Sequence, residues 1–462
     1  MAPFTEETES DVSIIFDSDV GANLLPRFTR REVFLLECAE QIQPRRSGAR
    51  TPVITSFRTV DARFTLKEGA GSDAVHTDPQ YGYGVTLLET DRGITGTGLT
   101  YTLGGGTNLV CEAIKLLIDP IIGRDIDELM ADFGAVQKKI AEHHLIRWLG
   151  PHKGVIHCAL ASITNACFDV WAKSRGLPLW KLLLSLSPEE LVALIDLSYL
   201  EDVLTRDEAV ALVSDHLPTR SQREAVLQSG YPGYDTSVGW FQYSDEQIAE
   251  NARRAVDAGF TAMKLKVGSA DPQRDVRRAK LVREVVGPNA KIMLDANQAW
   301  SLPTAIEVGR QLCEMQPFWI EEPTQPDDVI AHQTLARELA PVPIAVGEAV
   351  ANRIVWKNFL QADAVEIVQA DCTRLAGISE YLAVVLLAKK YPVRVVPHVG
   401  DMGQIHQHLV LFNHIALGHE KLFLEYIPHL RDYFVHPARV EDGVYHTPQE
   451  PGCSTDLKSE QT

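Results

Sequence analysis

The sequence lacks an excess of basic residues, and this absence limits the partners that it can bind. Its 462 residues contain 44 Lys and Arg against 62 Asp and Glu, so the formal net charge is -18. A nucleic-acid-binding protein needs basic surface to neutralise phosphates. The charge therefore argues against a nucleic-acid partner. An anionic small molecule can still bind where the local charge is favourable.

Cysteine is scarce, and its placement follows no pattern. The seven cysteines are scattered, odd in number and without a CxxC pair. Such a set makes neither a disulfide framework nor a zinc module, and reduced thiols fit a cytosolic type of compartment. The N-terminal segment MAPFTEETESDVSIIFDSDV has no basic region followed by an apolar run, so we expect no signal peptide. We therefore predict a cytoplasmic protein.

Long apolar runs and nucleotide-binding motifs are also missing. No uninterrupted apolar stretch reaches the roughly 18 residues of a membrane-spanning segment, so we expect no membrane partner. We find no GxGxxG after an expected strand and no GxxxxGK[ST]. Nucleotide binding therefore has no support from the sequence.

The first part of the chain reads as an extension followed by a small sheet. Residues 1–51 are polar and favour a disordered extension, in which residues 28–43 have the pattern of one amphipathic helix. Residues 53–66 alternate apolar and polar side chains, as a half-buried strand does. Residues 83–104 predict two strands around a turn at Asp91-Arg92-Gly93.

Helical patterns come next. They run from residue 108 to about 186 and are clearest at 154–176, where Gly176 is a candidate C-cap. A small sheet followed by helices makes residues 52–190 an α+β domain.

From residue 261 onward, short apolar runs alternate with amphipathic helical segments. This βα repeat predicts a parallel sheet with right-handed crossovers, and polar residues at each strand end favour a barrel. An open doubly wound sheet remains the alternative. The runs are TAMKLKVG, KIMLDANQ, FWIEEPT, PIAVGEA, AVEIVQAD and VRVVPHVG.

Ionisable residues stand on or at the end of each of these runs. In a barrel the carboxyl ends of the strands meet at one mouth, where active sites lie. Taken singly, a strand lysine is often a solvated edge residue, a strand-end acid a helix cap, and a lone histidine a loop residue. Six successive strands with such residues favour an active site instead. The residues are Lys264, Lys266, Asp295, Glu321, Glu322, Glu348, Asp371 and His398.

The residue types point to one kind of chemistry. Three carboxylates are hard oxygen ligands that suit Mg²⁺. A metal bound in this way stabilises the enediolate that forms when a proton leaves the carbon next to a carboxylate. We expect the cation of Lys264 to lower the pKa of Lys266, which makes Lys266 a usable base. His398 beside Asp371 is the oriented acid or base of the opposite side.

These residues resemble the enolase superfamily, in its mandelate-racemase-like subgroup, whose lysine or histidine bases with magnesium are known chemistry. The KxK strand, three acids on consecutive strands and a His-Asp dyad carry the resemblance, which covers residues 53 to about 457. The motifs are similar to those of the L-fuconate dehydratase family. They are GSDAVHTDPQY, LIRWLGPHKGVIH, YDTSVGW, KLKVG, DANQAW, WIEEPTQPDD and LAVVLLAKKY.

The resemblance implies a fold and a role for each motif residue. The implied fold is α/β, a modified (β/α)7β TIM-like barrel over residues 191–405 with the α+β domain of residues 52–190 as a cap. Residues 406–462 would complete both, and a homo-oligomer is expected. The implied magnesium ligands are Asp295, Glu321 and Glu348. The implied base is Lys266, the acid is His398, and Asp371 orients His398. The implied substrate-binding residues are Lys264, Asn297, Glu425, Gly71, Ser72, Asp73 and Tyr81.

The implied activity is magnesium-dependent dehydration of L-fuconate to 2-keto-3-deoxy-L-fuconate. L-galactonate is the alternative substrate, because it differs only by a terminal hydroxyl, against which an apolar pocket discriminates by ~100-fold at most. The same residues leave open a racemase or epimerase, and a binding protein that has lost turnover. The chain departs from the family at Ala349 and at Asp401-Met402 in a shortened segment after His398, so the rim near the substrate's far end differs.

Overall fold

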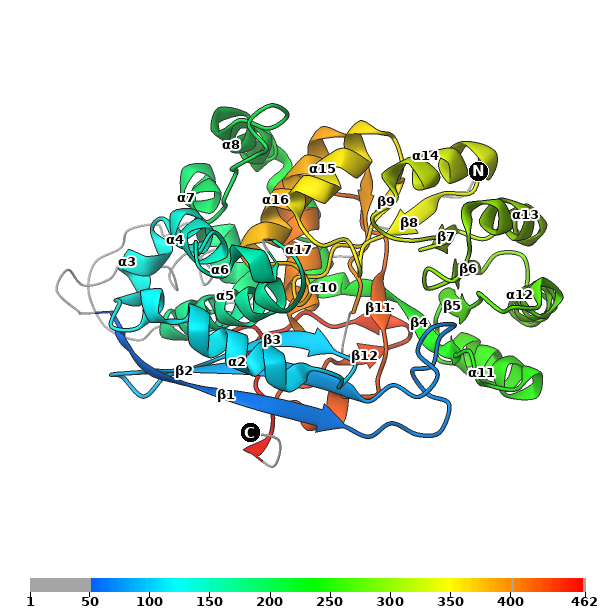
Figure 1. Ribbon diagram of the computed structural model, residues 1–462, viewed down its shortest axis with the longest axis horizontal. Helices are drawn as coiled ribbons and strands as arrows, with labels where there is room; N and C mark the ends of the chain where they lie inside the picture. The colour runs from blue at the N-terminus through cyan, green and yellow to red at the C-terminus, as the bar shows by residue number, and fades with distance from the viewer. Residues whose placement is uncertain (1–50, 151, 400–402, 460–462) are drawn as a thin grey trace, which may run out of the picture. The chain divides into compact units, whose positions relative to one another are not determined.

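The computed structural model describes residues 51–150, 152–399 and 403–459 (Figure 1). The predicted extension up to residue 50, its helix at residues 28–43, and the departure at Asp401-Met402 lie outside the described residues. Residues 51–462 form one compact unit.

The predicted N-terminal sheet is confirmed. It has three antiparallel strands in the order β1-β2-β3. The β2–β3 hairpin turns at the predicted place, where the Gly93 amide donates to the Thr90 carbonyl and Gly93 adopts a φ of +70°. The strands are β1 (Ile54–Phe64), β2 (Tyr81–Thr90) and β3 (Thr95–Thr102).

The predicted helices cover this sheet. The main one, α5 (Gly154–Ser174), packs closely on β3 because Gly98 has no side chain: a Cβ there would lie 1.9 Å from the Ser162 carbonyl oxygen. Gly176, with φ +65°, follows the helix end as predicted. Among the described helices, α5 is long and apolar enough to cross a membrane, but 89% of that window is buried inside the protein, as in a core helix.

Shorter helices complete this region and lead to the barrel. They are α2 (Thr107–Leu117), α3 (Ile126–Met130), α4 (Phe133–Ala141), α6 (Leu179–Ser185), α7 (Pro188–Ala193), α8 (Arg206–Ser214), α9 (Arg220–Arg223) and α10 (Val226–Ser229).

The βα repeat forms the predicted barrel, with eight parallel strands separated by seven helices (Figure 1). The last strand pairs with the first, Leu424 opposite Gly233, and the Val399 amide after β10 donates to Glu425 of β11 (2.9 Å), so the ring of strands closes and the open sheet is excluded. The strands are β4 (Tyr231–Gly239), β5 (Ala262–Lys266), β6 (Lys291–Asp295), β7 (Trp319–Glu321), β8 (Ile344–Val346), β9 (Ile367–Val368), β10 (Arg394–Val395) and β11 (Leu424–Tyr426). The helices are α11 (Asp245–Asp257), α12 (Pro272–Val286), α13 (Leu302–Cys313), α14 (Val329–Glu338), α15 (Arg353–Gln361), α16 (Ile378–Lys390) and α17 (Ile405–Leu417).

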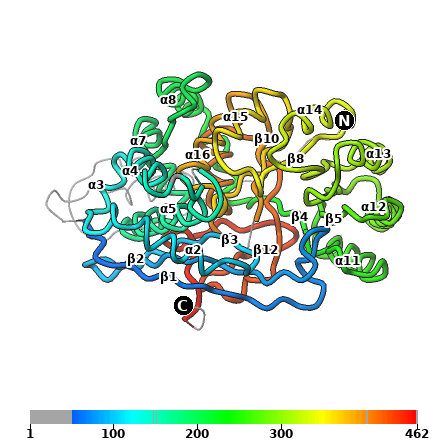
Figure 2. Tube along the Cα trace, in the orientation of Figure 1, coloured from blue at the N-terminus to red at the C-terminus, as the bar shows by residue number. Residues whose placement is uncertain are grey.

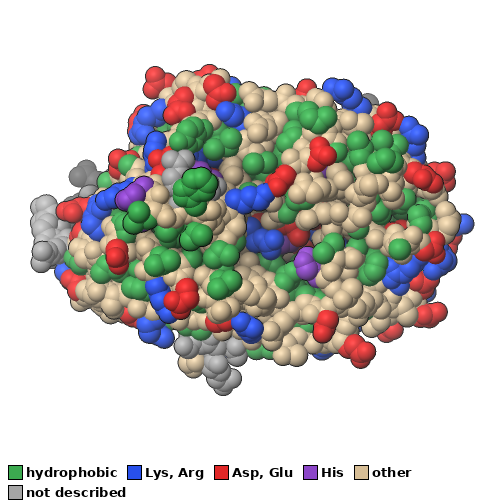
Figure 3. Space-filling view, in the orientation of Figure 1, with side chains coloured by type: hydrophobic (Ala, Val, Ile, Leu, Met, Phe, Trp, Pro, Cys, Tyr) green, Lys and Arg blue, Asp and Glu red, His purple; other side chains and the backbone are tan. Residues whose placement is uncertain are grey.

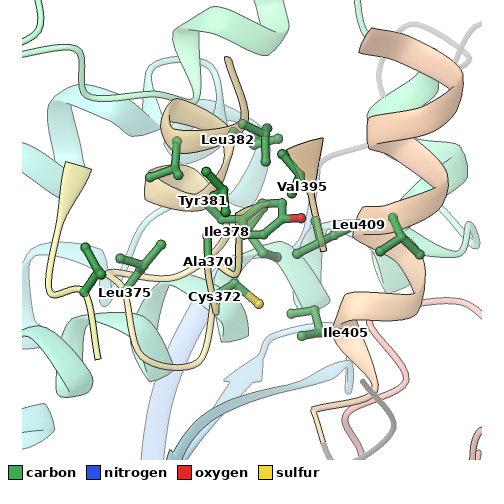
Figure 4. Packing of buried hydrophobic residues seen from close by; sticks show 14 of the residues in the cluster. Ala370, Cys372, Leu375, Ile378, Tyr381, Leu382, Val395, Ile405 and Leu409 are labelled. Carbon is green, nitrogen blue, oxygen red and sulfur yellow. The ribbon is translucent and has the colours of Figure 1, made fainter. Parts of the chain in front are cut away.

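The barrel interior has an apolar layer below its polar mouth. One side chain from each of seven strands contributes to it: Tyr234, Ala262, Met293, Trp319, Ala345, Ile367 and Val396. The alternate side chains of the strands point outward and pack against the helices. Figure 4 shows this outer packing, where Ala370 and Val395 lie with Ile405 and Leu409 of α17. The polar side chains of the barrel interior therefore lie above this apolar layer, at the mouth.

The C-terminal segment returns to the first domain (Figure 2). After the short hairpin β12 (Val440–Glu441) and β13 (Val444–Tyr445), it reaches α5 and β3. The buried Asp169 carboxylate accepts from the amides of Thr97 (2.8 Å) and Cys453 (2.7 Å). Lys173 Nζ lies 2.7 Å from Asp169 and from Asp456. The divisions after residues 190 and 405 stay predictions.

Replacing Lys173 tests this junction. Lys173→Met leaves the buried Asp169 carboxylate without its cation, so we expect a loss of about 3 kcal/mol in the free energy of unfolding. Lys115→Met is the control, because Lys115 pairs with Glu112 at the surface and such pairs contribute ~0.5 kcal/mol. Urea unfolding followed by circular dichroism measures both, and equal losses would contradict the role of Lys173.

Candidate active site

The predicted strand-end residues meet at the mouth of the barrel. Lys266 lies opposite Asp295 in the β5–β6 register, and Asp295 lies opposite Glu321 in the next pair. Glu348 lies two residues after the end of β8. Figure 3 shows basic, acidic and histidine side chains gathered in a recess near the centre of the visible face.

Asp295, Glu321 and Glu348 form a carboxylate triad. One oxygen from each lies within 4.8 Å of the others, and the side chain of Glu348 is 16% exposed. Burial and then the Asp295 carboxylate raise the pKa of Glu321 to about 7. Close carboxylates with one partly open member fit a divalent cation that keeps free coordination positions, as Mg²⁺ does. The triad could therefore hold the predicted metal.

Both lysines of the KxK strand point into this triad. Lys264 Nζ lies 2.9 Å from Glu321 Oε1 and 2.8 Å from Glu425 Oε1. Lys266 Nζ lies 2.5 Å from Asp295 Oδ2. Both side chains are at least nine-tenths buried.

The expected lowering of the pKa of Lys266 is wrong for this structure. Burial and the cation of Lys264 do lower it, but the carboxylates of Asp295 and Glu348 outweigh them, so the pKa of Lys266 is raised. The prediction considered only the neighbour on the same strand. The acids come from other strands, and the closing of the barrel brings them to the amine.

The His-Asp dyad is present at the other side of the triad. His398 Nδ1 lies 2.9 Å from Asp371 Oδ2, and His398 Nε2 lies 2.9 Å from Glu348 Oε2. Burial lowers the pKa of His398, but these two carboxylates and that of Glu425 raise it to about 10. The imidazole is thus held as a cation whose Nε2 proton points into the site.

Lys266 and His398 contact different members of the triad. Lys266 pairs with Asp295 on β6, whereas His398 pairs with Glu348 after β8. The amine and the imidazole therefore flank the triad from separate strands. This arrangement suits one group taking a proton and the other giving one to the same bound molecule.

Glu425 and Asn297 lie in the same mouth. Glu425 accepts from Thr236 Oγ1 (2.7 Å) and from the Val399 amide (2.9 Å), in addition to its pair with Lys264. The Asn297 amide donates to Asp295 Oδ1 (3.0 Å), and its φ is +42°. Asn297 Oδ1 is buried and has no protein partner among the described residues. That oxygen is available to a polar ligand.

The predicted cap-loop residues Gly71, Ser72, Asp73 and Tyr81 hold the loop between β1 and β2. Ser72 Oγ donates to the Gly69 carbonyl (2.6 Å) and accepts from the Gln242 amide (3.0 Å), which joins the loop to the segment that follows β4. Asp73 accepts from the amide of His76 (2.7 Å). Gly71 has φ +75°, and a Cβ there would lie 2.8 Å from Tyr81 Oη. The side chains of Ser72 and Asp73 thus maintain the loop itself.

The structure adds residues that sequence reasoning did not assign. Glu322 is buried beside the triad, and burial followed by Glu348 raises its pKa. Its signal was present in the Glu321-Glu322 pair. His406 Nε2 lies 3.1 Å from Asp371 Oδ1, and the Tyr101 ring lies 6.5 Å from His398. Neither residue stands at a barrel strand end, so the pattern gave no signal for them.

Two family models match the chain. Residues 54–183 match the mandelate racemase/muconate lactonizing enzyme N-terminal domain, and residues 247–462 match the enolase C-terminal domain-like family. These ranges include the first sheet and every strand of the barrel except β4.

Relatives extend over most of the chain. Human mitochondrial enolase superfamily member 1 is 40% identical over 88% of this chain and 94% of its own. Its crystal structure has a TM-score of 0.86 at 38% identity and covers 89% of this chain and 96% of that one. L-galactonate dehydratase of Hypocrea jecorina is 39% identical over 88% of this chain and 92% of its own.

A more distant solved structure is L-talarate/galactarate dehydratase from Salmonella typhimurium, liganded with Mg and L-lyxarohydroxamate. Its TM-score is 0.70 at 25% identity, and the match covers 91% of this chain and 94% of that one. The capped barrel, the carboxylate triad and these matches agree, and the chain belongs to the enolase superfamily, with the N-terminal and C-terminal domains of its mandelate racemase/muconate lactonizing enzyme branch.

Proposed function

We propose that this enzyme is a magnesium-dependent acid-sugar dehydratase, a hydro-lyase that removes water from a sugar acid to give a 2-keto-3-deoxy acid. The observation that carries the proposal is the placing of Lys266 and His398 against different members of one carboxylate triad. The family supports it, since two of the relatives above are named as sugar-acid dehydratases.

Different residues would bind the substrate, remove its proton and protonate the leaving group. Lys264, held by Glu425, would bind the reacting carboxyl group of the substrate. Asn297 Oδ1 and Glu425 would accept hydrogen bonds from substrate hydroxyl groups. Lys266 takes the proton from the carbon next to the carboxylate. His398, oriented by Asp371, gives its Nε2 proton to the departing β-hydroxyl group.

Asp295, Glu321 and Glu348 would hold Mg²⁺. When bound, the ion supplies positive charge that stabilises the negative charge developing on the substrate carboxylate. The same charge offsets the effect of Asp295 and Glu348 on the pKa of Lys266. Lys266 then becomes a better base than it is beside the bare carboxylates.

We infer that L-fuconate is the substrate, from the motifs of the chain, with 2-keto-3-deoxy-L-fuconate as the product. L-galactonate is the second candidate, and the likeness to the Hypocrea enzyme favours it. The raised pKa of His398 favours a proton donor at that position, which fits dehydration better than racemisation by two bases. A homo-oligomer and a cytoplasmic location stay predictions.

Turnover with Mg²⁺ in deuterated water tests the function. We expect the purified enzyme to convert L-fuconate, L-galactonate or both to the 2-keto-3-deoxy acid. Lys266→Ala should abolish product formation and α-proton exchange, because no other group takes the proton. Mass spectrometry and NMR measure both. A stereoisomer in place of a keto acid would indicate a racemase, and absence of turnover with Mg²⁺ bound would contradict the proposal.

Calorimetry tests the metal ligands. Glu321→Gln removes a charged ligand, so we expect the Mg²⁺ dissociation constant to rise at least ~10-fold. Glu322→Gln is the matched control, because Glu322 is an equally buried neighbour on the same strand end that is not a member of the triad. Equal weakening in the two variants would remove Glu321 from the ligand set.

The dyad predicts a pH response. In wild type the acid form of His398 persists until the pH rises through its pKa of about 10. Asp371→Asn removes one of the three carboxylates that raise this pKa, so the acid form should disappear at a lower pH. NMR titration of the His398 imidazole in the presence of a chelator measures the change. An unchanged pKa would show that Asp371 does not stabilise the cation.

A further inference from the structure

The inner face of the barrel carries a polar side chain that no role yet explains. We propose that Gln369 binds the hydroxyl group that leaves the substrate and holds it as water beside His398. The inference rests on the proposed dehydration, and it assigns a binding residue for the leaving group.

Gln369 points into the barrel, as the side-chain alternation of β9 requires. Ile367 belongs to the inner apolar layer, whereas Val368 and Ala370 belong to the outer cluster. Figure 4 shows Ala370 and Cys372 among the outer packing residues, with Ile405 of α17 nearby. Because successive side chains alternate, Gln369 and Asp371 lie on the opposite, inner face. Gln369 is therefore one step deeper in the barrel than Asp371.

The amide of Gln369 has no partner. Its residue is 1% exposed, and both Nε2 and Oε1 lack a hydrogen bond to any described residue. A buried amide without partners is costly, so native proteins usually fill such a position with water or a ligand. An amide both donates and accepts, which suits a hydroxyl group or a water molecule.

The neighbours of Gln369 on the inner face offer no competing polar group. On β8 the adjacent inner residue is Gly347, where a Cβ would lie 2.1 Å from the Gln369 carbonyl. On β10 the adjacent inner residue is Val396 of the apolar layer. Of the three neighbouring inner positions in the described structure, Gln369 is therefore the one with a polar side chain.

The proton-donating atom of His398 lies over the end of β9. Its contact with Glu348 Oε2 joins residues that follow β10 and β8, the two strands on either side of β9. Asp371 cannot serve the leaving group. Its Oδ2 accepts from His398, and its Oδ1 accepts from Thr373 at 2.7 Å. The Gln369 amide is therefore the group that remains to bind the leaving oxygen.

The step balances in atoms and electrons. After Lys266 has taken the C2 proton, the electrons of the substrate enediolate form the C2–C3 double bond and restore the carboxylate. The C3–O bond breaks, the oxygen leaves with its electron pair, and it takes the Nε2 proton of His398 to become water. The enol then tautomerises to the ketone. Gln369 Nε2 donates to the departing oxygen, and Oε1 accepts from its hydrogen.

The test compares two steps of the reaction, the exchange of the C2 proton and the loss of the C3 hydroxyl group. Gln369→Met keeps the volume and removes both hydrogen-bonding atoms. With the sugar acid that wild type converts, in deuterated water with Mg²⁺, we expect keto acid formation to fall ~10-fold to 100-fold. Deuterium entry at C2 of the recovered substrate should persist, because proton removal precedes hydroxyl loss. The ratio of exchange to elimination therefore rises, with KM unchanged.

Gln137→Met is the control for loss of a buried glutamine, since Gln137 Nε2 donates to the Ala376 carbonyl and its Oε1 accepts from Ser379 Oγ of α16, away from the triad and the dyad. It should leave the ratio unchanged. If Gln369→Met does not fold, Gln369→Asn keeps the amide on a shorter chain, and a smaller rise in the ratio is expected. A parallel fall of exchange and elimination would overturn the proposal as a structural effect. Unchanged rates would overturn it in favour of a buried water only. Failure of wild type to turn over any acid would instead defeat the proposed function.

Discussion

The need to compensate buried charge is the constraint on which the rest of the structure depends. The barrel mouth holds the triad together with Asp371 and Glu425, and burial alone would neutralise such carboxyl groups. Lys264, Lys266 and His398 provide the opposite charge at hydrogen-bonding distance. The lysine and histidine assigned to the chemistry are therefore also the groups that allow the acids to be packed together. Structural and chemical roles cannot be separated at this site.

The cap and the plug make this charge arrangement possible from two sides. The apolar layer from Tyr234 to Val396 closes the barrel below the mouth, so the charged side chains lie above apolar groups. Above, the loop between β1 and β2 is tied to the segment that follows β4 through Ser72. In this contact a main-chain amide donates to the Ser72 hydroxyl. The first domain thus contacts the barrel here without engaging the charged side chains.

Much of this organisation could be predicted from the sequence. Alternation and helical periodicity predicted the three cap strands, α5 and six of the barrel strands. β4 was not recognised by pattern, because YDTSVG is partly polar, and β11 was not recognised either. Strand-end chemistry indicated the charged residues, but not the raised pKa of Lys266 or the nearness of His406, which come from strands and a helix far apart in sequence. Gln369 gave no signal either, because a glutamine stands out only when its partners are known to be missing.

The return of the C-terminal segment to α5 and β3 has a consequence for the order of assembly. Asp169 meets Cys453 across 284 residues, and Thr97 meets Asp456 across 359. During synthesis the whole barrel leaves the ribosome before these contacts can form, and contacts between such distant residues form slowly. The first sheet and α5 must therefore wait for the end of translation to gain their last stabilising partners. The contacts that fasten the cover are thus among the last that a nascent chain can form.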